Sequence, residues 1–359
     1  MEPAPPPTKI PMWIDCDSGH DDAFAILIAA HHPHIDLMGV STVHGNSSLV
    51  NTTYNTLSIL DAIGQSHIPV FPGASTPFCR DPVNAEEFHG GSGLDGTTLL
   101  PTPTRSVFGQ GPAAHEIAKA LYTTAKDTAW LVAIGPLTNI ALLFALYPDL
   151  VDHIKGLSIM GGAIGSGGQD KVGIMKNDCM PCHGTGATSY AEFNIWCDPE
   201  SARSVFRNTA LRPKTVLIPL DLTNQACATP EIRQRLLNGQ RGVTKLRRAF
   251  YELIMFYGSS YARDTDLKQG PPLHDALAVA AVMFNHNNKG ISIQAQETAE
   301  TSWSIDVILS GKQVGRTVVY PLEMSGTRIP NSIEFAKFWE MLEECLDHAD
   351  KATDYQAIS

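Results

Sequence analysis

The sequence is poor in charged residues and contains no long apolar run. Only 18% of its 359 residues are charged, whereas 43% are hydrophobic, a balance that excludes an intrinsically disordered chain. The 37 acidic residues outnumber the 26 basic ones, and the formal charge of −11 argues against binding to nucleic acid, which requires basic surfaces. No stretch of about 18 apolar residues occurs, so no transmembrane helix and no membrane partner are expected.

Cysteine is scarce and irregularly spaced. The seven cysteines form no regular pattern and are odd in number, which is typical of unpaired thiols in a reducing compartment. Residues 1–9 are rich in proline and lack the apolar core of a signal peptide. We therefore expect a flexible tail at residues 1–9 and a cytoplasmic enzyme.

Short apolar runs alternate with helical patterns through the first two-thirds of the chain. Strands are predicted at 12–16, 37–43, 129–134 and 156–160, and helices at 21–31, 49–62, 113–125 and 137–145. The alternation predicts an α/β fold of Rossmann-like type, with a mostly parallel central sheet flanked by helices. The last third is predicted to be more helical, with helices at 230–238, 244–261, 274–284 and 333–345 and strands at 292–296, 302–309 and 313–319.

The chain shows no internal repeat and no low-complexity linker. We therefore predict one domain over residues 10–346, followed by a C-terminal tail at 347–359. A glycine-rich insertion without periodicity is predicted at about residues 165–189. Ligands of such sheets bind at the carboxyl ends of the strands.

Four aspartates follow the first predicted strand, in Asp15-Cys-Asp-Ser-Gly-His-Asp-Asp22. Asp15 and Asp17 stand two apart on one face, and Asp21 and Asp22 open the next helix, so all four are expected to converge. At 4–5 Å each pair repels by roughly 3–4 kcal/mol at an effective dielectric of 20. A helix start offsets only about 1 kcal/mol of this, so a cation or raised pKa values must compensate. Oxygen ligands favour Ca²⁺ or Mg²⁺ over zinc.

This segment resembles the N-terminal aspartate motif of the nucleoside hydrolases, the inosine–uridine-preferring nucleoside N-ribohydrolase family. Six more segments resemble family motifs in the same order: Val43-His-Gly-Asn46, His89-Gly-Gly-Ser-Gly-Leu-Asp-Gly96, Ile134-Gly-Pro-Leu-Thr-Asn139, Met160-Gly-Gly162, Ala191-Glu-Phe-Asn-Ile-Trp-Cys-Asp-Pro-Glu200 and Pro272-Leu-His274-Asp275. The resemblance covers roughly residues 10–345. Seven motifs in one order are highly specific, and they imply the nucleoside hydrolase fold.

The resemblance also implies the chemistry: hydrolysis of the N-glycosidic bond of ribonucleosides to ribose and free base, with Ca²⁺ as cofactor. The implied metal ligands are Asp17, Asp22, Asp275 and the main-chain carbonyl of Ile134. Asp17 would act as general base towards a calcium-bound water, and His274 would assist the leaving base as an acid. Asp15 would lie behind the metal ligands and orient them.

Further residues are implied to contact the substrate: Asp21, Asn46, His89, Met160, Glu192, Phe193, Asn194, Tyr257 and Tyr261. Glu192 and Asn194 stand two apart, so an extended segment would direct both at the ribose. The expected partner is a small nucleoside. Family members are commonly dimers or tetramers, so a homodimer or homotetramer is expected.

Several alternatives stay open at this point. Asp15-x-Asp17 after a strand also fits the nucleophile motif of haloacid-dehalogenase-like phosphatases, and a non-catalytic ribose-binding module would share the fold. Taken alone, His274 would more often be a capping or core residue, and a tyrosine pair four apart is often only packing. The base preference is not fixed, although His89 together with His274 favours the inosine–uridine or pyrimidine-preferring branches.

Two features depart from the family pattern. The family places an asparagine that contacts the ribose 5′ hydroxyl shortly before Glu192, and this sequence has none there. Second, the insertion carries Cys179-Met-Pro-Cys182-His183, which matches the spacing of c-type haem attachment. We interpret this pair as part of a solvated loop.

Overall fold

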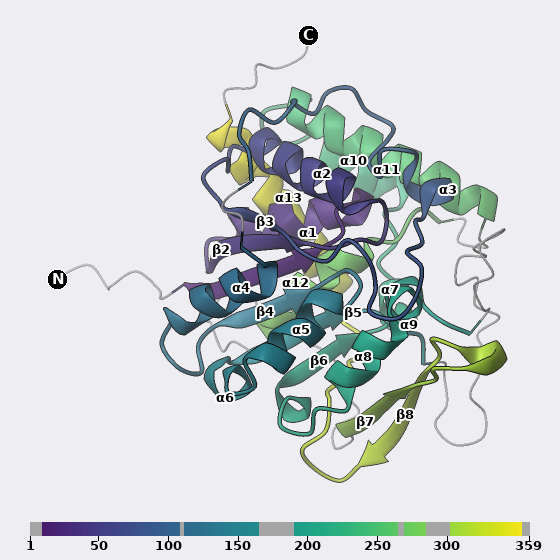
Figure 1. Ribbon diagram of the computed structural model, residues 1–359. Coiled ribbons are helices and arrows are strands. Elements are labelled where there is room, and N and C mark those ends of the chain that lie inside the picture. The colour runs from purple at the N-terminus through teal and green to yellow at the C-terminus, as the bar shows by residue number, and fades with distance from the viewer. Residues whose placement is uncertain (1–8, 108–110, 165–189, 265–268, 285–301, 354–359) are drawn as a thin grey trace.

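The computed structural model describes residues 9–107, 111–164, 190–264, 269–284 and 302–353. Its centre is a six-stranded parallel sheet with the strand order β3-β2-β1-β4-β5-β6 (Figure 1). The strands are β1 Ile10–Cys16, β2 Ile35–Thr42, β3 Val70–Pro72, β4 Trp130–Ala133, β5 Gly156–Met160 and β6 Thr215–Ile218. The order reverses beside β1, and such a switch point opens a crevice at the carboxyl ends of the strands.

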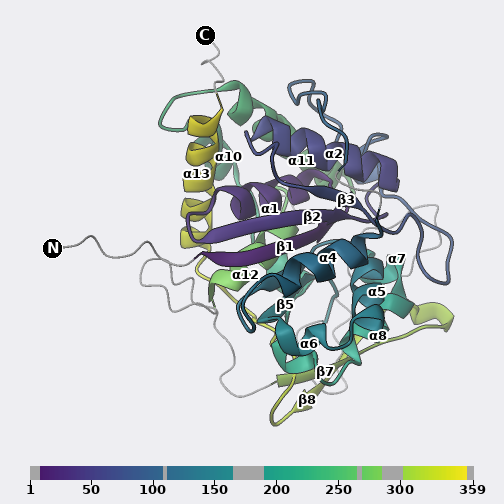
Figure 2. The same cartoon turned by 60° about the vertical axis from the view of Figure 1, so that its left-hand side comes forward.

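Helices cover both faces of this sheet (Figure 2). One layer contains α1 His20–His31, α2 Leu49–Ala62, α12 His274–Phe284 and α13 Phe335–Ala352, and the other contains α4 Ala113–Tyr122, α5 Thr138–Leu146, α6 Leu150–His153 and α8 Pro199–Phe206. Successive residues of β1 point to opposite layers: Met12 and Ile14 pack in the first core, and Trp13 packs in the second. Both faces are therefore buried, as parallel sheets require.

The remaining elements lie around the sheet. They are α3 Glu86–His89, α7 Phe193–Cys197, α9 Leu220–Thr223, α10 Pro230–Leu237, α11 Lys245–Asp264 and an antiparallel hairpin of β7 Ser302–Val307 and β8 Thr317–Leu322. Ile305 and Val307 of the hairpin join the second core. Among the described residues, no helix has both the length and the apolarity needed to cross a membrane.

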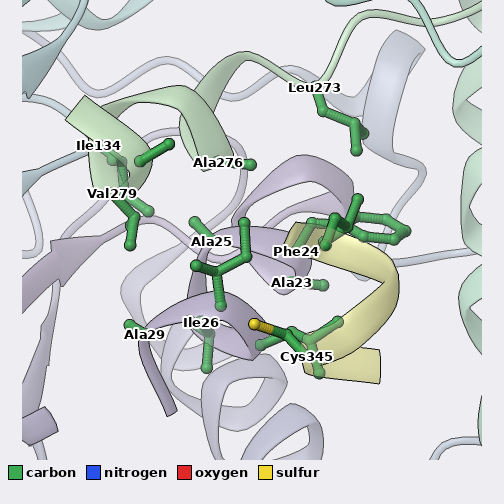
Figure 3. Packing of buried hydrophobic residues seen from close by; sticks show 14 of the residues in the cluster. Ala23, Phe24, Ala25, Ile26, Ala29, Ile134, Leu273, Ala276, Val279 and Cys345 are labelled. Carbon is green, nitrogen blue, oxygen red and sulfur yellow. The ribbon is translucent and has the colours of Figure 1, made fainter. Parts of the chain in front are cut away.

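Helices α1 and α12 pack closely because small side chains lie between them. Figure 3 shows Ala25 of α1 near Ala276 and Val279 of α12, with Cys345 of α13 beside α1. Residues at the start of α1 and at the start of α12 thereby come together at the carboxyl edge of the sheet. This packing determines where the acidic side chains meet.

A buried ion pair fastens α11 to α13. The Arg247 side chain, 1% exposed, contacts the carboxylates of Asp350 and Asp347, and the Thr244 hydroxyl donates to Asp350 at 2.6 Å. Asp350 is 1% exposed, so a buried charge stands on each side of the contact. Such a pair holds the helices in one relative position, because the loss of either partner would leave a buried charge without compensation.

The predicted parallel α/β fold is confirmed, and α2, β5 and α12 have the predicted bounds. The short strands β3 and β6 and the helices α7 and α8 were not predicted. The closing helix continues to Ala352 instead of ending at 345, because Leu346 and Ala349 extend its buried face. Residues 347–352 are therefore helix rather than tail. The predicted strand at 292–296 and the insertion at 165–189, with Cys179 and Cys182, lie outside the described residues.

Candidate active site

Three buried carboxylates meet at the carboxyl edge of the sheet. Asp21 and Asp22 lie in the first turn of α1 and Asp275 in the first turn of α12. Each offers an oxygen, and these oxygens all lie within 4.8 Å of one another. The side chains are at most 4% exposed. Two helix N-termini face this group, and both favour negative charge.

Asp17 and Asp22 each keep one buried oxygen without a hydrogen-bond partner. Asp17 Oδ2 accepts from the Asn46 main-chain N–H at 2.8 Å, and Asp22 Oδ2 accepts from Gly19 N–H at 2.8 Å. Within the described part of the chain, the Oδ1 atoms of both residues have no partner. Gly45, at a φ of 155°, lies so close to Asp17 that a side chain there would overlap its carboxylate. Two buried oxygens without partners among several carboxylates are suited to bind a cation.

The pKa values of these acids are raised. Burial is the largest cause, followed by the neighbouring carboxylates: the pKa of Asp21 rises to about 7, and burial raises that of Asp22 to about 6. The pKa values of Asp17 and Asp275 lie well above the usual range for the same two reasons. The donors are all hard oxygens, so the residues fit a divalent cation such as Ca²⁺ or Mg²⁺.

The structure corrects the predicted convergence of four N-terminal aspartates. Asp15 lies within β1, and its Oδ1 accepts from the Ser41 hydroxyl and, at 2.8 Å, from Asn139 Nδ2. Burial raises its pKa to about 7. Asp15 thus ties β1 to β2 and α5, and a carboxylate held by these two contacts does not suit a phosphatase nucleophile. Asp275, from the other end of the chain, joins Asp21 and Asp22 instead.

A pocket of about 550 Å³, counting its open mouth, lies beside the carboxylates. Its lining contains the predicted residues Asp21, Asn46, His89, Ile134, Met160, Glu192, Phe193, Asn194, Tyr257, His274 and Asp275. Asp17 and Asp22 are not part of the lining. Tyr261 belongs to α11, but its side chain lies outside the described residues. The lining also includes Leu220 and Asn224, which the sequence analysis missed because it predicted no element there.

Glu192 and Asn194 do not lie on an extended segment, contrary to the prediction. Glu192 is the N-cap of α7, and its carboxylate accepts from the main-chain N–H groups of Asn194 at 2.9 Å and Ile195 at 3.1 Å. It also accepts from Gly162 N–H at 2.9 Å. Burial raises the pKa of Glu192 although these bonds lower it. The carboxylate therefore fixes the start of α7 against the turn after β5.

The Asn194 side chain contacts the main chain directly after β4. Its Nδ2 donates to the main-chain carbonyl of Ile134 at 3.0 Å. A carbonyl oxygen has two lone pairs, so one remains for a further contact. The Ile134 carbonyl, predicted as a metal ligand, is thus held in place at the floor of the pocket.

Two histidines pair at one wall of the pocket. His89 Nδ1 lies 3.0 Å from His20 Nδ1, and His20 Nε2 lies 2.8 Å from the Asp95 carbonyl oxygen. The His20 ring stacks on Phe256 and Tyr257 at 5.2 and 5.5 Å. Burial lowers the pKa of His20 to about 4 and that of His89 well below its usual value. His20 escaped the sequence analysis, because its role depends on a partner 69 residues away.

His274 is the first residue of α12 and lines the pocket beside Asp275. Its Nδ1 lies 2.7 Å from the Thr223 hydroxyl. Burial lowers the pKa of His274 to about 3, so the ring is neutral near pH 7. A neutral imidazole in this place donates a hydrogen bond with one nitrogen and accepts with the other.

A doubly covered parallel sheet with a buried carboxylate cluster and a polar pocket at its carboxyl edge defines an α/β enzyme that acts on a small polar substrate beside a cation site. Comparisons with known proteins show to which family of enzymes the chain belongs. Residues 12–340 match the family model described as inosine-uridine preferring nucleoside hydrolase. The chain belongs to this family and is a nucleoside N-ribohydrolase.

Two relatives are similar over almost their whole length. The uridine nucleosidase of Saccharomyces cerevisiae is 35% identical, with 96% of this chain and 98% of the relative covered. The pyrimidine-specific ribonucleoside hydrolase RihB of Escherichia coli is 34% identical, with 93% and 96% covered. The structure of a purine-preferring ribonucleoside hydrolase from Gardnerella vaginalis has a TM-score of 0.75 at 24% identity, with 95% of this chain and 99% of that chain covered, and confirms the fold.

Proposed function

We propose that this enzyme hydrolyses pyrimidine ribonucleosides, with uridine as the preferred substrate, to ribose and free base, and that Ca²⁺ is its cofactor. The observation that carries the proposal is the group of three buried carboxylates, Asp21, Asp22 and Asp275, of which Asp21 and Asp275 line the pocket. The names of the two relatives at 35% and 34% identity support the pyrimidine preference. The pocket lining contains no tryptophan among the described residues, so no indole stacks on a purine there.

Asp17, Asp22, Asp275 and the Ile134 carbonyl would hold the cation, and the position of Asp21 places its carboxylate at the same group. Bound Ca²⁺ supplies the positive charge that compensates the carboxylates, gathers water and ribose hydroxyls, and lowers the pKa of that water. Ca²⁺ is favoured over Mg²⁺ because these protein oxygens, together with two ribose hydroxyls and a water, would give seven or eight ligands, more than the six that Mg²⁺ accepts.

Asp17 serves as the general base. Its Oδ2 is held by the Asn46 main-chain N–H, so Oδ1 is the atom that takes the proton from the attacking water. The water attacks the anomeric carbon while the bond to the base breaks, and the transition state resembles an oxocarbenium ion. The buried carboxylates stabilise this positive charge.

The rest of the lining divides between the sugar and the base. Asp21, Asn46, Met160, Glu192 and Asn194 bind the ribose, and His89, Phe193 and Tyr257 surround the base. Tyr257 is 3% exposed and lies against His20 and His89, so the wall is rigid. His274 stands beside Asp275, where it assists the departure of the base.

A nucleoside panel tests the proposal. Uridine, cytidine, inosine, adenosine and guanosine are incubated with the enzyme, and free ribose is measured by a reducing-sugar assay before and after chelation. Uridine and cytidine should give the highest kcat/KM, chelation should abolish turnover, and Ca²⁺ should restore it. Higher kcat/KM on inosine than on uridine would contradict the base preference, and full activity without any metal by elemental analysis would contradict the cofactor.

We also propose a cytoplasmic enzyme that forms a homodimer or homotetramer. The five described cysteines are free thiols, which supports a reducing compartment. Light scattering after size-exclusion chromatography measures the assembly, and a monomeric mass at micromolar concentration would contradict it.

A further inference from the structure

The hydroxyl of Thr223 has one hydrogen-bond partner among the described residues, the Nδ1 atom of His274. Thr223 is the last residue of α9 and is 0% exposed. Its Oγ1 lies 2.7 Å from Nδ1. Thr223 does not line the pocket.

The direction of this hydrogen bond follows from burial. A buried hydroxyl hydrogen without an acceptor is unfavourable, and Nδ1 is the acceptor that the described residues offer to Thr223. The hydroxyl therefore donates and Nδ1 accepts. A neutral imidazole carries its one N–H hydrogen on the other nitrogen in that case, so the His274 proton is on Nε2. Because Nδ1 accepts this hydrogen bond, the ring carries a single hydrogen and is neutral.

We propose that Thr223 is a positioning residue that holds His274 in the Nε2–H tautomer, so that a neutral imidazole donates a hydrogen bond to the departing base. This inference rests on the proposed function. The electron pair of the N-glycosidic bond leaves with the base, whose carbonyl oxygen accepts the hydrogen bond. The proton that the attacking water gives to Asp17 balances the charge and ends on the released base. His274 thus acts without first becoming an imidazolium ion.

The test compares Thr223→Val, which keeps the shape and loses the hydroxyl, with Thr223→Ser, which keeps the hydroxyl. Both are measured in the calcium-loaded enzyme on uridine and on p-nitrophenyl riboside, whose leaving group departs without help. Thr223→Val should lower kcat on uridine about tenfold, the effect of one hydrogen bond, with KM nearly unchanged. Thr223→Ser should restore most of the rate, and p-nitrophenyl riboside should respond far less to either change.

A matched control is Thr215→Val. Thr215 is another buried threonine, 3% exposed, whose hydroxyl donates to the Leu211 carbonyl at 3.0 Å, away from the pocket. Thr215→Val should leave the ratio of kcat on uridine to kcat on p-nitrophenyl riboside at the wild-type value. Equal losses on both substrates for Thr223→Val, no loss on uridine, or failure of the serine variant to recover would each overturn the proposal.

The tautomer is also measured without turnover. Nitrogen NMR on protein labelled with ¹⁵N-histidine, with the His274 signals identified by their absence in His274→Gln, distinguishes a protonated from an unprotonated ring nitrogen. The proposal expects hydrogen on Nε2 in the wild type, and hydrogen on Nδ1 would overturn it. This measurement stands even if the valine variant does not fold. A wild-type enzyme that cleaves no nucleoside but shows the Nε2–H tautomer would instead contradict the proposed function.

Discussion

Replacing Asp22 by asparagine should have opposite effects on the metal-free and the metal-loaded protein. The oxygens of Asp21, Asp22 and Asp275 lie within 4.8 Å, so each ionised pair repels by at least about 3.5 kcal/mol at an effective dielectric of 20. Three such pairs amount to roughly 10 kcal/mol, which is comparable with the whole stability of a typical protein. Without a cation, ionising all three carboxylates in the folded state would therefore cost much of the free energy of unfolding.

The pKa of Asp22, raised from 3.8 to about 6, determines the sign of the pH dependence. Between about pH 4 and 6 the folded protein retains a proton that the unfolded chain has released, so this contribution to stability is present below pH 4 and is lost as pH rises through 6. Asp21, with its pKa near 7, extends the loss to about pH 7. For Asp22, a rise in pKa of this size corresponds to about 3 kcal/mol. Chelated enzyme should therefore melt at a lower temperature at pH 8 than at pH 5.

At pH 8, Asp22→Asn removes this penalty of about 3 kcal/mol. It also weakens the hydrogen bonds from Gly19 and Asn46, which subtracts about 1 kcal/mol. The chelated variant should thus gain about 2 kcal/mol and melt roughly 3 °C higher than the chelated wild type. With Ca²⁺ present, in contrast, the wild type should melt at a higher temperature than the variant, because a cation that binds only the folded state stabilises it.

Thermal unfolding followed by circular dichroism, at pH 5 and 8 with and without Ca²⁺, measures all four states. Asp198→Asn is the matched control: Asp198 is fully buried and accepts from the Thr138 hydroxyl at 2.7 Å, away from the three carboxylates. It should destabilise chelated and loaded protein equally. If Asp22→Asn lowers the melting temperature of chelated protein at pH 8 as much as Asp198→Asn does, the repulsion is not present and the reasoning is refuted.

Three further predictions concern single contacts. His274→Ala should slow uridine cleavage by about 10²–10⁴-fold while barely affecting p-nitrophenyl riboside; equal losses in steady-state assays would leave the role unassigned. If Asn194 and Glu192 bind ribose hydroxyls, 2′-deoxyuridine should have a kcat/KM up to about 10⁴-fold below that of uridine, and comparable values would exclude the contact. Asp350→Ala should lower the free energy of unfolding in urea by about 3 kcal/mol, because the buried Arg247 keeps only Asp347 of its two carboxylates and the Thr244 hydroxyl loses its acceptor. Glu343→Ala, at the more exposed pair with Arg235, should lower it by less than about 1 kcal/mol, and similar values for the two would contradict the assignment.

The layered fold was predictable because its long elements carry clear patterns. The helix at 274–284 is apolar with small residues throughout, and its bounds agree with the structure. β3 and β6, at three and four residues, are too short for alternation to distinguish them from loop. α7 was missed for a different reason: Glu192 caps it through main-chain N–H groups, and a Glu-x-Asn spacing alone is equally compatible with a strand.

The site was only partly predictable from local patterns. Asp17, Asp21 and Asp22 are close in sequence, so their proximity follows from one turn between a strand and a helix. Asp275 and Asp21 are far apart along the chain, and only the resemblance to a family connected them. His20 and Thr223 escaped notice because each acts on a histidine 69 or 51 residues away. Asp15 differs from Asp17 because it lies within β1, where Ser41 and Asn139 hydrogen-bond its carboxylate, whereas Asp17 follows the end of the strand at Cys16.

The carboxylate cluster depends on the packing of α12 against α1, so it can form only after both helices have been synthesised. Asp21 and Asp22 leave the ribosome early, and Asp275 follows only after some 250 further residues, when most of the sheet has been made. Until α12 docks through Ala276 and Val279, a nascent chain has two of its three clustered carboxylates and no closed site. A cation that joins both helices closes a loop of about this length, and the loss of chain entropy on closure grows with loop length. If these carboxylates form the active site, nucleoside cleavage should begin only when the last third of the chain has folded onto the first.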